Sequence, residues 1–222
     1  HGIFEARVKA SQLKSGYHLI ANYDGVEHRY DDPYRFAPNL GDLDLHLLSE
    51  GRHVHAFKAL GAHVQKQESV AGTRFTVWAP NAAGVCVAGD FNMWSTTKHP
   101  MRSRGASGIW ELFIPGVDDG AAYKYAIRDT DGHMHPLKAD PIGFGAEMRP
   151  KSASVVRDLS TYKWKDSPWM KTRANRHHRE APMSVYEVHL GSWQRTENNQ
   201  YLTYAQLAEK LIPYVKQLGF TH

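Results

Sequence analysis

An internal repeat constrains the fold of this chain more than any other feature of its sequence. Three short matches define the two copies: Gly2–Ala6 with Gly108–Leu112, Asp24-Gly25 with Asp131-Gly132, and Asp32-Pro33 with Asp140-Pro141. The offset drifts only from 106 to 108 residues, as expected when two copies of one unit differ by single insertions in loops. We therefore expect two related modules. We expect the second to begin near Thr73 and the first to lack about 35 residues of its opening.

The second copy has the alternating pattern of short β-strands. Strands are expected at 73–79, 85–88, 109–114 and 122–128. Turn-forming residues separate them, including Pro80-Asn81 and the Asp131-Gly132 pair, which suits a tight hairpin. Short strands at this spacing predict a mainly β fold, a small Ig-like β-sandwich.

The tryptophans of this copy differ in their surroundings. Trp78 continues a strand alternation and is expected to pack inside, whereas Trp94 follows the polar, turn-forming stretch 89–93 and has fewer neighbours to bury it. A sugar ring exposes flat patches of C–H bonds on which an exposed indole stacks, so Trp94 is a candidate sugar platform. Trp110 shares the apolar face of its strand. Core packing is its first interpretation and carbohydrate binding its second.

The residues from 183 onward have a different pattern. Residues 183–190 alternate and are rich in β-formers, which predicts a strand, and a helix follows from a capping box at Thr203 and Gln206. Pro213 is expected to kink or break this helix, and 220–222 lie where a next strand would begin. One such unit cannot bury its apolar faces without parallel neighbours. We therefore expect the chain to end inside a domain.

Composition argues against several classes of protein. A net charge of +4 from 27 basic and 23 acidic residues is small and dispersed, so nucleic-acid binding is not expected. The longest apolar runs, such as 85–88, fall far short of the ~20 residues that cross a bilayer, so no membrane span is expected. The single cysteine, Cys86, cannot form an intrachain disulfide and fits a reducing compartment. The 14 histidines lack ligand spacing, so no metal site is expected.

Five motifs give the second copy a specific resemblance to a known family. They are Phe75–Ala82, Gly89–Trp94, Gly108–Pro115, Tyr123–Tyr125 and Lys138–Pro141. In this order they resemble the glycogen-binding type of β-sandwich in bacterial glycogen branching enzymes, which are α-amylase-type glycoside hydrolases. Segments at 31–36, 41–46, 50–53 and 60–63 resemble the connector of longer members, which carry two sandwiches. Residues 184–193 are similar to the first strand of the catalytic (β/α)₈ barrel.

The resemblance implies a domain order for the whole chain. The expected parts are the C-terminal part of a first sandwich at 1–36, a connector at 37–64, a glycogen-binding-type sandwich at 65–160, a linker at 161–182 and the start of a truncated barrel at 183–222. It also implies a cytoplasmic parent protein with 1,4-α-glucan branching activity. Such a retaining glycosyltransferase cleaves an α-1,4 glucan and transfers the segment to a 6-hydroxyl, without a cofactor. Its catalytic carboxylates follow later barrel strands, so the chain alone is expected to be inactive, with no catalytic residue.

The resemblance implies an α-glucan partner such as glycogen or amylose. Trp94 and Lys124 match the first tryptophan and the lysine with which related glycogen-binding subunits hold glucose. The second tryptophan of that site would fall near Met134, so we expect weak or relocated sugar binding, or a sandwich that mainly braces the barrel. Two alternatives stay open: a free-standing glucan-binding module, and a fragment of a debranching or trehalose-releasing enzyme. Nothing in the sequence predicts the oligomeric state.

Overall fold

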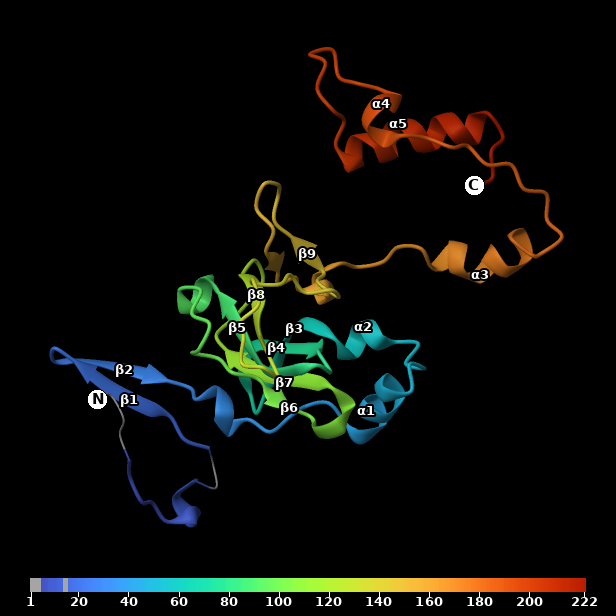
Figure 1. Cartoon of the computed structure of the whole chain (residues 1–222). Helices are drawn as coiled ribbons and strands as arrows, with labels where there is room; N and C mark the ends of the chain where they lie inside the picture. Colours follow the sequence, from blue (N-terminus) through green and yellow to red (C-terminus); the bar gives the residue numbers. More distant parts are fainter. Residues whose placement is uncertain (1–4, 14–15) are drawn as a thin grey trace. The chain divides into compact units, whose positions relative to one another are not determined.

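The structure of the chain is a computed structural model that describes residues 5–13 and 16–222. It divides into two compact units, 1–161 and 162–222 (Figure 1). The Gly2–Phe4 part of the internal repeat lies outside the described residues. Farther along the first copy, strands β1 (Leu19–Tyr23) and β2 (Val26–Tyr30) form an antiparallel hairpin. Its turn residues Asp24 and Gly25 have φ angles of 51° and 85°, the left-handed pair that a two-residue hairpin turn requires.

Two four-stranded antiparallel sheets make up the rest of the strand structure that is described in the first unit. One contains β3 (Gly61–Gln67), β4 (Val70–Trp78), β7 (Ile109–Pro115) and β6 (Arg102–Ser103), in that order. The other contains β5 (Ala82–Gly89), β8 (Ala122–Asp129), β10 (Ser154–Val155) and β9 (Gly145–Ala146). The four strands predicted from alternation are confirmed. Strand β3 was not predicted, and it begins within the range expected for the connector.

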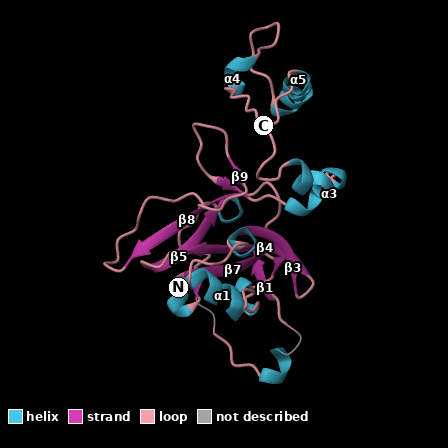
Figure 2. Ribbon diagram, turned by 90° about the vertical axis from the view of Figure 1, so that its right-hand side faces the viewer, coloured by secondary structure: helices cyan, strands magenta, loops and turns pink. Residues whose placement is uncertain are grey.

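The hydrophobic core lies between these two sheets, as a β-sandwich requires. Figure 2 shows the two sheets as separate layers. Phe75 and Leu112 from one sheet and Val87, Tyr123 and Tyr125 from the other belong to the buried core cluster. The rings of Phe75 and Tyr123 meet edge to face with their centroids 4.9 Å apart. The predicted core face of β8 is therefore confirmed.

The prediction that Trp78 packs inside is wrong, because its side chain is 57% exposed. Phe75 and Val77 are the core-facing residues at this end of β4, and side chains alternate along a strand. Trp78 is the last residue of β4 and therefore points to the outer face of the sheet, where no later strand residue covers it. Alternation alone gives this result once Val77 is assigned to the core.

A buried carboxyl ties two core tyrosines to the loop that follows β8. The hydroxyls of Tyr123 and Tyr125 donate to Oδ2 of Asp140 at 2.7 and 3.1 Å, and the backbone N–H of Ile142 donates to its Oδ1 at 2.8 Å. Burial raises the pKa of Asp140 above its ordinary value, and burial likewise raises the pKa of both tyrosines. Because these hydrogen bonds satisfy the polar groups inside the core, we assign Asp140 a structural role.

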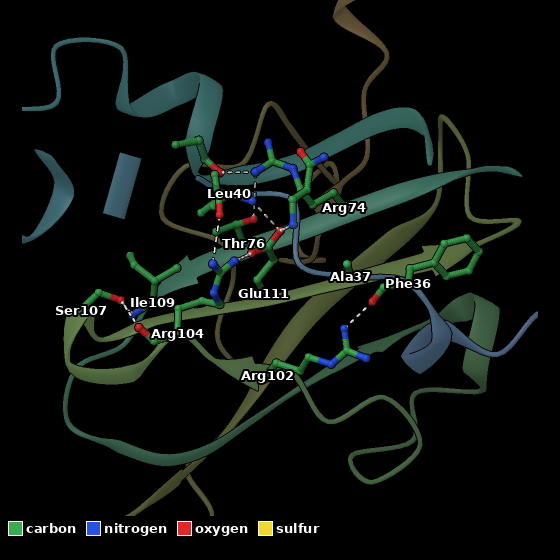
Figure 3. A network of polar contacts seen from close by, with 12 residues as sticks. Phe36, Ala37, Leu40, Arg74, Thr76, Arg102, Arg104, Ser107, Ile109 and Glu111 are labelled. Atoms are coloured by element: carbon green, nitrogen blue, oxygen red, sulfur yellow. Dashed lines mark hydrogen bonds and ion pairs between the residues drawn. The ribbon is translucent and has the colours of Figure 1, made fainter. Parts of the chain in front are cut away.

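The segment that precedes β3 is anchored to the sandwich by a buried polar network (Figure 3). Glu111 on β7 is 3% exposed, and its Oε1 accepts the backbone N–H groups of Asn39 and Leu40 at 2.6 and 3.1 Å. Its Oε2 accepts a hydrogen bond from Arg104, which also donates to the carbonyl of Leu40 at 3.0 Å. Arg102 donates in the same way to the carbonyl of Phe36. The connector is therefore part of the sandwich unit and not a free linker.

Two short helices follow in the range expected for the connector, α1 (Asp42–Ser49) and α2 (Ala56–Ala59), and residues of both pack together with Leu40. A second apolar cluster of Leu40, Ala59, Leu60 and Ile109 covers part of the outer face of the sheet. Buried Arg74 on β4 donates to the carbonyls of Lys58 and Ala59 at 2.9 and 3.0 Å and so holds the C-terminal end of α2.

The strand predicted at 183–190 is not present. Residues 183–189 have no regular structure, and Leu190–Trp193 form the short helix α4. The cause is a shortage of partners, because a strand is stabilised by ladder hydrogen bonds. Here Ser184 accepts from the N–H of His222 at 3.0 Å and Tyr186 donates to the carbonyl of His222 at 2.8 Å, which is the bonding pattern of one parallel pair.

Helices account for the regular structure of the second unit. Helix α3 (Ser167–Arg176) lies within the range expected for the linker, 161–182, and its residues are exposed. In α5 (Tyr204–Gln217) the capping box at Thr203 and Gln206 is confirmed. Of the kink or break expected at Pro213, the break is absent, because α5 continues through this residue. Glu209, whose carbonyl loses its N–H partner, is exposed, so water can supply that hydrogen bond.

Among the described residues, no helix combines the length and apolar content that crossing a bilayer requires.

Candidate functional site

An open hollow of about 530 Å³ on the sandwich brings Trp94 and Lys124 together. Trp94 comes from the turn after β5 and Lys124 from the outward face of β8. The indole of Trp94 is 37% exposed. Two residues that lie thirty positions apart in the sequence thus line one surface.

A buried asparagine fixes the turn that carries Trp94. The Nδ2 of Asn92 donates to the carbonyl of Val87 at 2.9 Å, and its Oδ1 accepts the N–H of Gly89 at 3.0 Å. The N–H of Trp94 donates to the carbonyl of Gly89 at 2.8 Å. These bonds hold both Met93 and Trp94 at a φ of 57°, a left-handed conformation that costs ~1–2 kcal/mol for each non-glycine residue. The platform is therefore held in place by the buried hydrogen bonds around it.

Charged and polar groups line the rest of this hollow. The ammonium of Lys124 donates to Oγ of Ser152 at 2.9 Å. Asp90 accepts the N–H of Ala122 at 3.1 Å through Oδ2. Glu147 accepts the N–H of Ala153 at 3.1 Å and lies 3.5 Å from the ammonium of Lys151. An exposed indole beside fixed donors and acceptors is the combination with which proteins hold sugar rings and their hydroxyls.

Trp110, the third predicted sugar-binding residue, lies in a different hollow of about 500 Å³. Its side chain is half-buried, and its Nε1 donates to the carbonyl of Ala79 at 3.1 Å. Met134 lines this second hollow as well and is 52% exposed. The structure therefore does not bring Trp110 or Met134 to Trp94.

Sequence analysis missed the polar groups around Trp94. Asp90 precedes Trp94 in the same turn, so the motif Gly89–Trp94 could have indicated it. Glu147, Lys151 and Ser152 belong to the loop from β9 to β10, and the pairing of β10 with β8 brings this loop to Lys124. Nothing in their local sequence signals that they lie beside Lys124.

A small cluster on the hairpin after β8 offers groups that can bind a metal ion. Ligand atoms of Asp129, Asp131 and His133 lie within 4.8 Å of one another. Oδ1 of Asp129 accepts the backbone N–H groups of Asp131 and His133 at 3.0 and 2.8 Å. This is how an Asp side chain closes a tight turn, and it accounts for the cluster without a metal ion.

Known proteins are similar to this chain both within the sandwich and along the residues outside it. Residues 59–143 match the model of carbohydrate-binding module 48 (isoamylase N-terminal domain). The chain is 48% identical to the 1,4-alpha-glucan branching enzyme GlgB of Roseobacter denitrificans, an alignment that covers 100% of this chain and 30% of that protein. It is 53% identical to GlgB of Rubrobacter xylanophilus over 89% of this chain and 27% of that protein. The chain thus spans about 30% of the length of the curated relatives that it matches.

Among solved structures, the catalytic module of the glycogen-degrading pneumococcal virulence factor SpuA aligns with 73% of this chain and with 26% of its own length. The TM-score is 0.53 at 20% sequence identity, which shows a shared fold.

Proposed function

This chain is homologous along its whole length to 1,4-α-glucan branching enzymes, and we propose that it is the glucan-holding, sandwich-bearing part of such an enzyme. Its relatives at 48% and 53% identity are named branching enzymes, which favours branching over a debranching or trehalose-releasing activity. The residues beyond the sandwich, 162–222, align with the same relatives. This favours an enzyme part over a free-standing binding module.

The observation that carries the binding role is the meeting of Trp94 and Lys124 in one hollow. In this proposal a glucose ring of the glucan stacks on the indole of Trp94. Lys124 donates to its hydroxyls, and the carboxylates of Asp90 and Glu147 accept from them. The hollow is open, so a long polymer can lie across it without threading its end. One platform in place of two predicts weak binding per site, which suits a surface that must release its glucan.

We assign the second unit to the start of a catalytic barrel. The parallel hydrogen bonds between Ser184, Tyr186 and His222 enclose helix α5, as in one strand-helix-strand unit. We place the barrel from 183, a linker at 161–182 and the end of a first sandwich at 1–36. The carboxylates that would cleave and transfer the glucan lie outside this chain in this assignment. The chain alone should therefore form no α-1,6 linkages from amylose.

The binding proposal is tested by native electrophoresis of the 222-residue chain in gels with and without glycogen. Trp94→Ala should weaken retention about 2- to 10-fold, which corresponds to the ~0.5–1.5 kcal/mol of one aromatic contact. Lys124→Met should weaken it less, because it removes a donor and leaves the platform in place. Trp164→Ala is the matched control, since Trp164 is 76% exposed and lies outside the hollow. Equal retention of the Trp94 and Trp164 variants would refute the assignment of the site.

A further inference from the structure

The exposed indole of Trp78 lies in a hollow of its own at the end of the sandwich. This hollow has a volume of about 440 Å³, and the polar residues that line it are Asn81, Asp129, His135 and Lys138. It shares no lining residue with the hollow of Trp94. Trp78 is more exposed than Trp94, at 57% against 37%, although it continues a core-forming strand.

Backbone hydrogen bonds hold the platform of Trp78 in place. Its neighbour Ala79 donates to the carbonyl of Gly108 at 2.8 Å and accepts from Nε1 of Trp110 at 3.1 Å. Gly108 has a φ of 71°, and a Cβ there would lie 2.8 Å from the backbone of Pro80. The two chain segments therefore approach each other as closely as a glycine permits. An exposed ring on such a fixed backbone loses little conformational freedom when it binds a ligand.

The polar groups of this hollow are also fixed. Oδ1 of Asp129 accepts two backbone N–H groups, and its Oδ2 lies 3.4 Å from Nε2 of His135 and 3.6 Å from Nδ1 of His133. Lys138 exchanges two backbone hydrogen bonds with Tyr125, at 2.8 and 2.9 Å, so its position beside β8 is set. Within the part of the chain that the structure describes, the ammonium of Lys138 forms no ion pair. An acceptor and a donor thus border the indole.

We propose that the Trp78 hollow is a second α-glucan contact site, with Trp78 as the stacking platform, Asp129 as acceptor and Lys138 as donor. The proposal rests on the glucan-binding function proposed above. It is favoured by the recurrence of the same three groups, since Trp94, Asp90 and Lys124 form the corresponding set in the other hollow. The charged rim argues for a hydroxyl-rich ligand over an apolar protein surface, because a protein partner would have to bury both charges. Leu137 lines one hollow and Lys138 the other, so the two sites adjoin the same segment.

The test is an NMR titration of the 222-residue chain with maltoheptaose, in which the six tryptophan indole N–H signals are assigned by single Trp→Phe substitutions. The signals of Trp78 and Trp94 should both shift and saturate. Trp78→Ala should leave the titration of Trp94 unchanged within about 2-fold, and Asp129→Asn should weaken that of Trp78 about 3- to 10-fold. The signal of Trp164 serves as the control and should not move.

The outcomes separate this inference from the proposed function. A shift at Trp94 with none at Trp78 overturns the second site and leaves the first intact. A shift at Trp78 with none at Trp94 supports the second site and refutes the first assignment. If neither signal moves, both fail. Because Trp78 is an exposed residue at the end of a strand, Trp78→Ala should keep the fold, and the dispersion of the backbone amide signals verifies this in the same spectra.

Discussion

The two units of this chain differ in how much of their apolar surface they bury. In residues 5–161 the two sheets of the sandwich bury their inner faces against each other. In residues 162–222 the buried apolar side chains are Leu202 and Leu207, while large ones such as Ile212 stay exposed. A sandwich completes its core with its own strands, whereas a single strand-helix-strand unit leaves open the faces that parallel neighbours would cover. We therefore expect the first unit to contribute nearly all of the free energy of unfolding.

Deleting a core ring gives the largest effect that this comparison predicts. Phe75 is fully buried between the sheets, so Phe75→Ala should lower the free energy of unfolding by about 3–5 kcal/mol through lost burial and the cavity it leaves. Ile212→Ala on α5 is the matched control. Its side chain is 52% exposed, so the change should stay within about 0.5 kcal/mol. Urea denaturation followed by circular dichroism measures both. Comparable losses would mean that the second unit has a core of its own.

Neutralising the buried anchor of the connector should have the next largest effect. Glu111→Gln replaces the buried carboxylate that accepts from Arg104 with a neutral amide oxygen, which is a weaker acceptor. Because a hydrogen bond to a charged group contributes ~1.5–3 kcal/mol, the free energy of unfolding should fall by up to about that amount. The control is Glu50→Gln. It removes the charge of an exposed ion pair, in which Glu50 and Arg52 lie 3.5 Å apart, and should lower the free energy of unfolding by less than ~1 kcal/mol. Urea denaturation again gives the difference. If the two substitutions cost the same, the network does not anchor the connector.

The sequence predicted the sandwich better than it predicted the second unit, for a physical reason. Alternation in 73–79 and 122–128 reports which side chains a two-sided sheet buries, and both segments find their partners within the same unit. Residues 183–190 have the same alternation, but in the structure their backbone pairing with another segment is confined to the hydrogen bonds of Ser184 and Tyr186 with Thr221 and His222. A strand pattern therefore predicts a strand only where neighbours exist.

Trp78 apart, what sequence analysis missed within the sandwich depends on contacts between distant segments. The pairing of β3 with β4 recruits a polar stretch, Gly61–Gln67, that has little apolar signal of its own. Glu111 looks like the exposed residue of a half-buried strand until the N–H groups of Asn39 and Leu40 reach it. The meeting of Trp94 with Lys124 was expected from family resemblance and not from their local sequence, because it depends on how β5 and β8 pair.

Acid should weaken the first unit selectively. Burial lowers the pKa of His63 and His99 below the ordinary value of 6.5. The folded form thus resists protonation, so this part of its stability is fully present above pH ~6.5 and is lost as the pH falls below that value. Nδ1 of His99 lies 2.8 Å from Nδ2 of Asn92, which helps to hold the Trp94 turn. The urea midpoint of the chain should therefore fall between pH ~7.5 and ~5.5.

The matched control for this pH dependence is His177→Asn in the second unit. His177 is exposed and contacts His222, so its replacement should leave the pH profile of the midpoint unchanged. His99→Gln should make the profile shallower, because the glutamine amide does not titrate in this range and His63 remains. A flat profile in the unsubstituted chain would show that burying these histidines has no stability cost in acid.

The smallest change in global stability should come from Pro213→Ala, and it separates the two units most directly. Proline has no N–H to donate to the carbonyl of Glu209, and alanine restores that bond within α5. Proline is ~3 kcal/mol less favourable than alanine inside a helix, so the amide hydrogens of α5 should exchange several-fold more slowly in the variant. The urea midpoint of the sandwich should not move if the two units unfold independently. Hydrogen exchange read by mass spectrometry reports on α5 and on β4, β7 and β8 in one experiment. Slower exchange in those strands as well would mean that the two units unfold together. They would then differ in how much apolar surface they expose, but not in their stability.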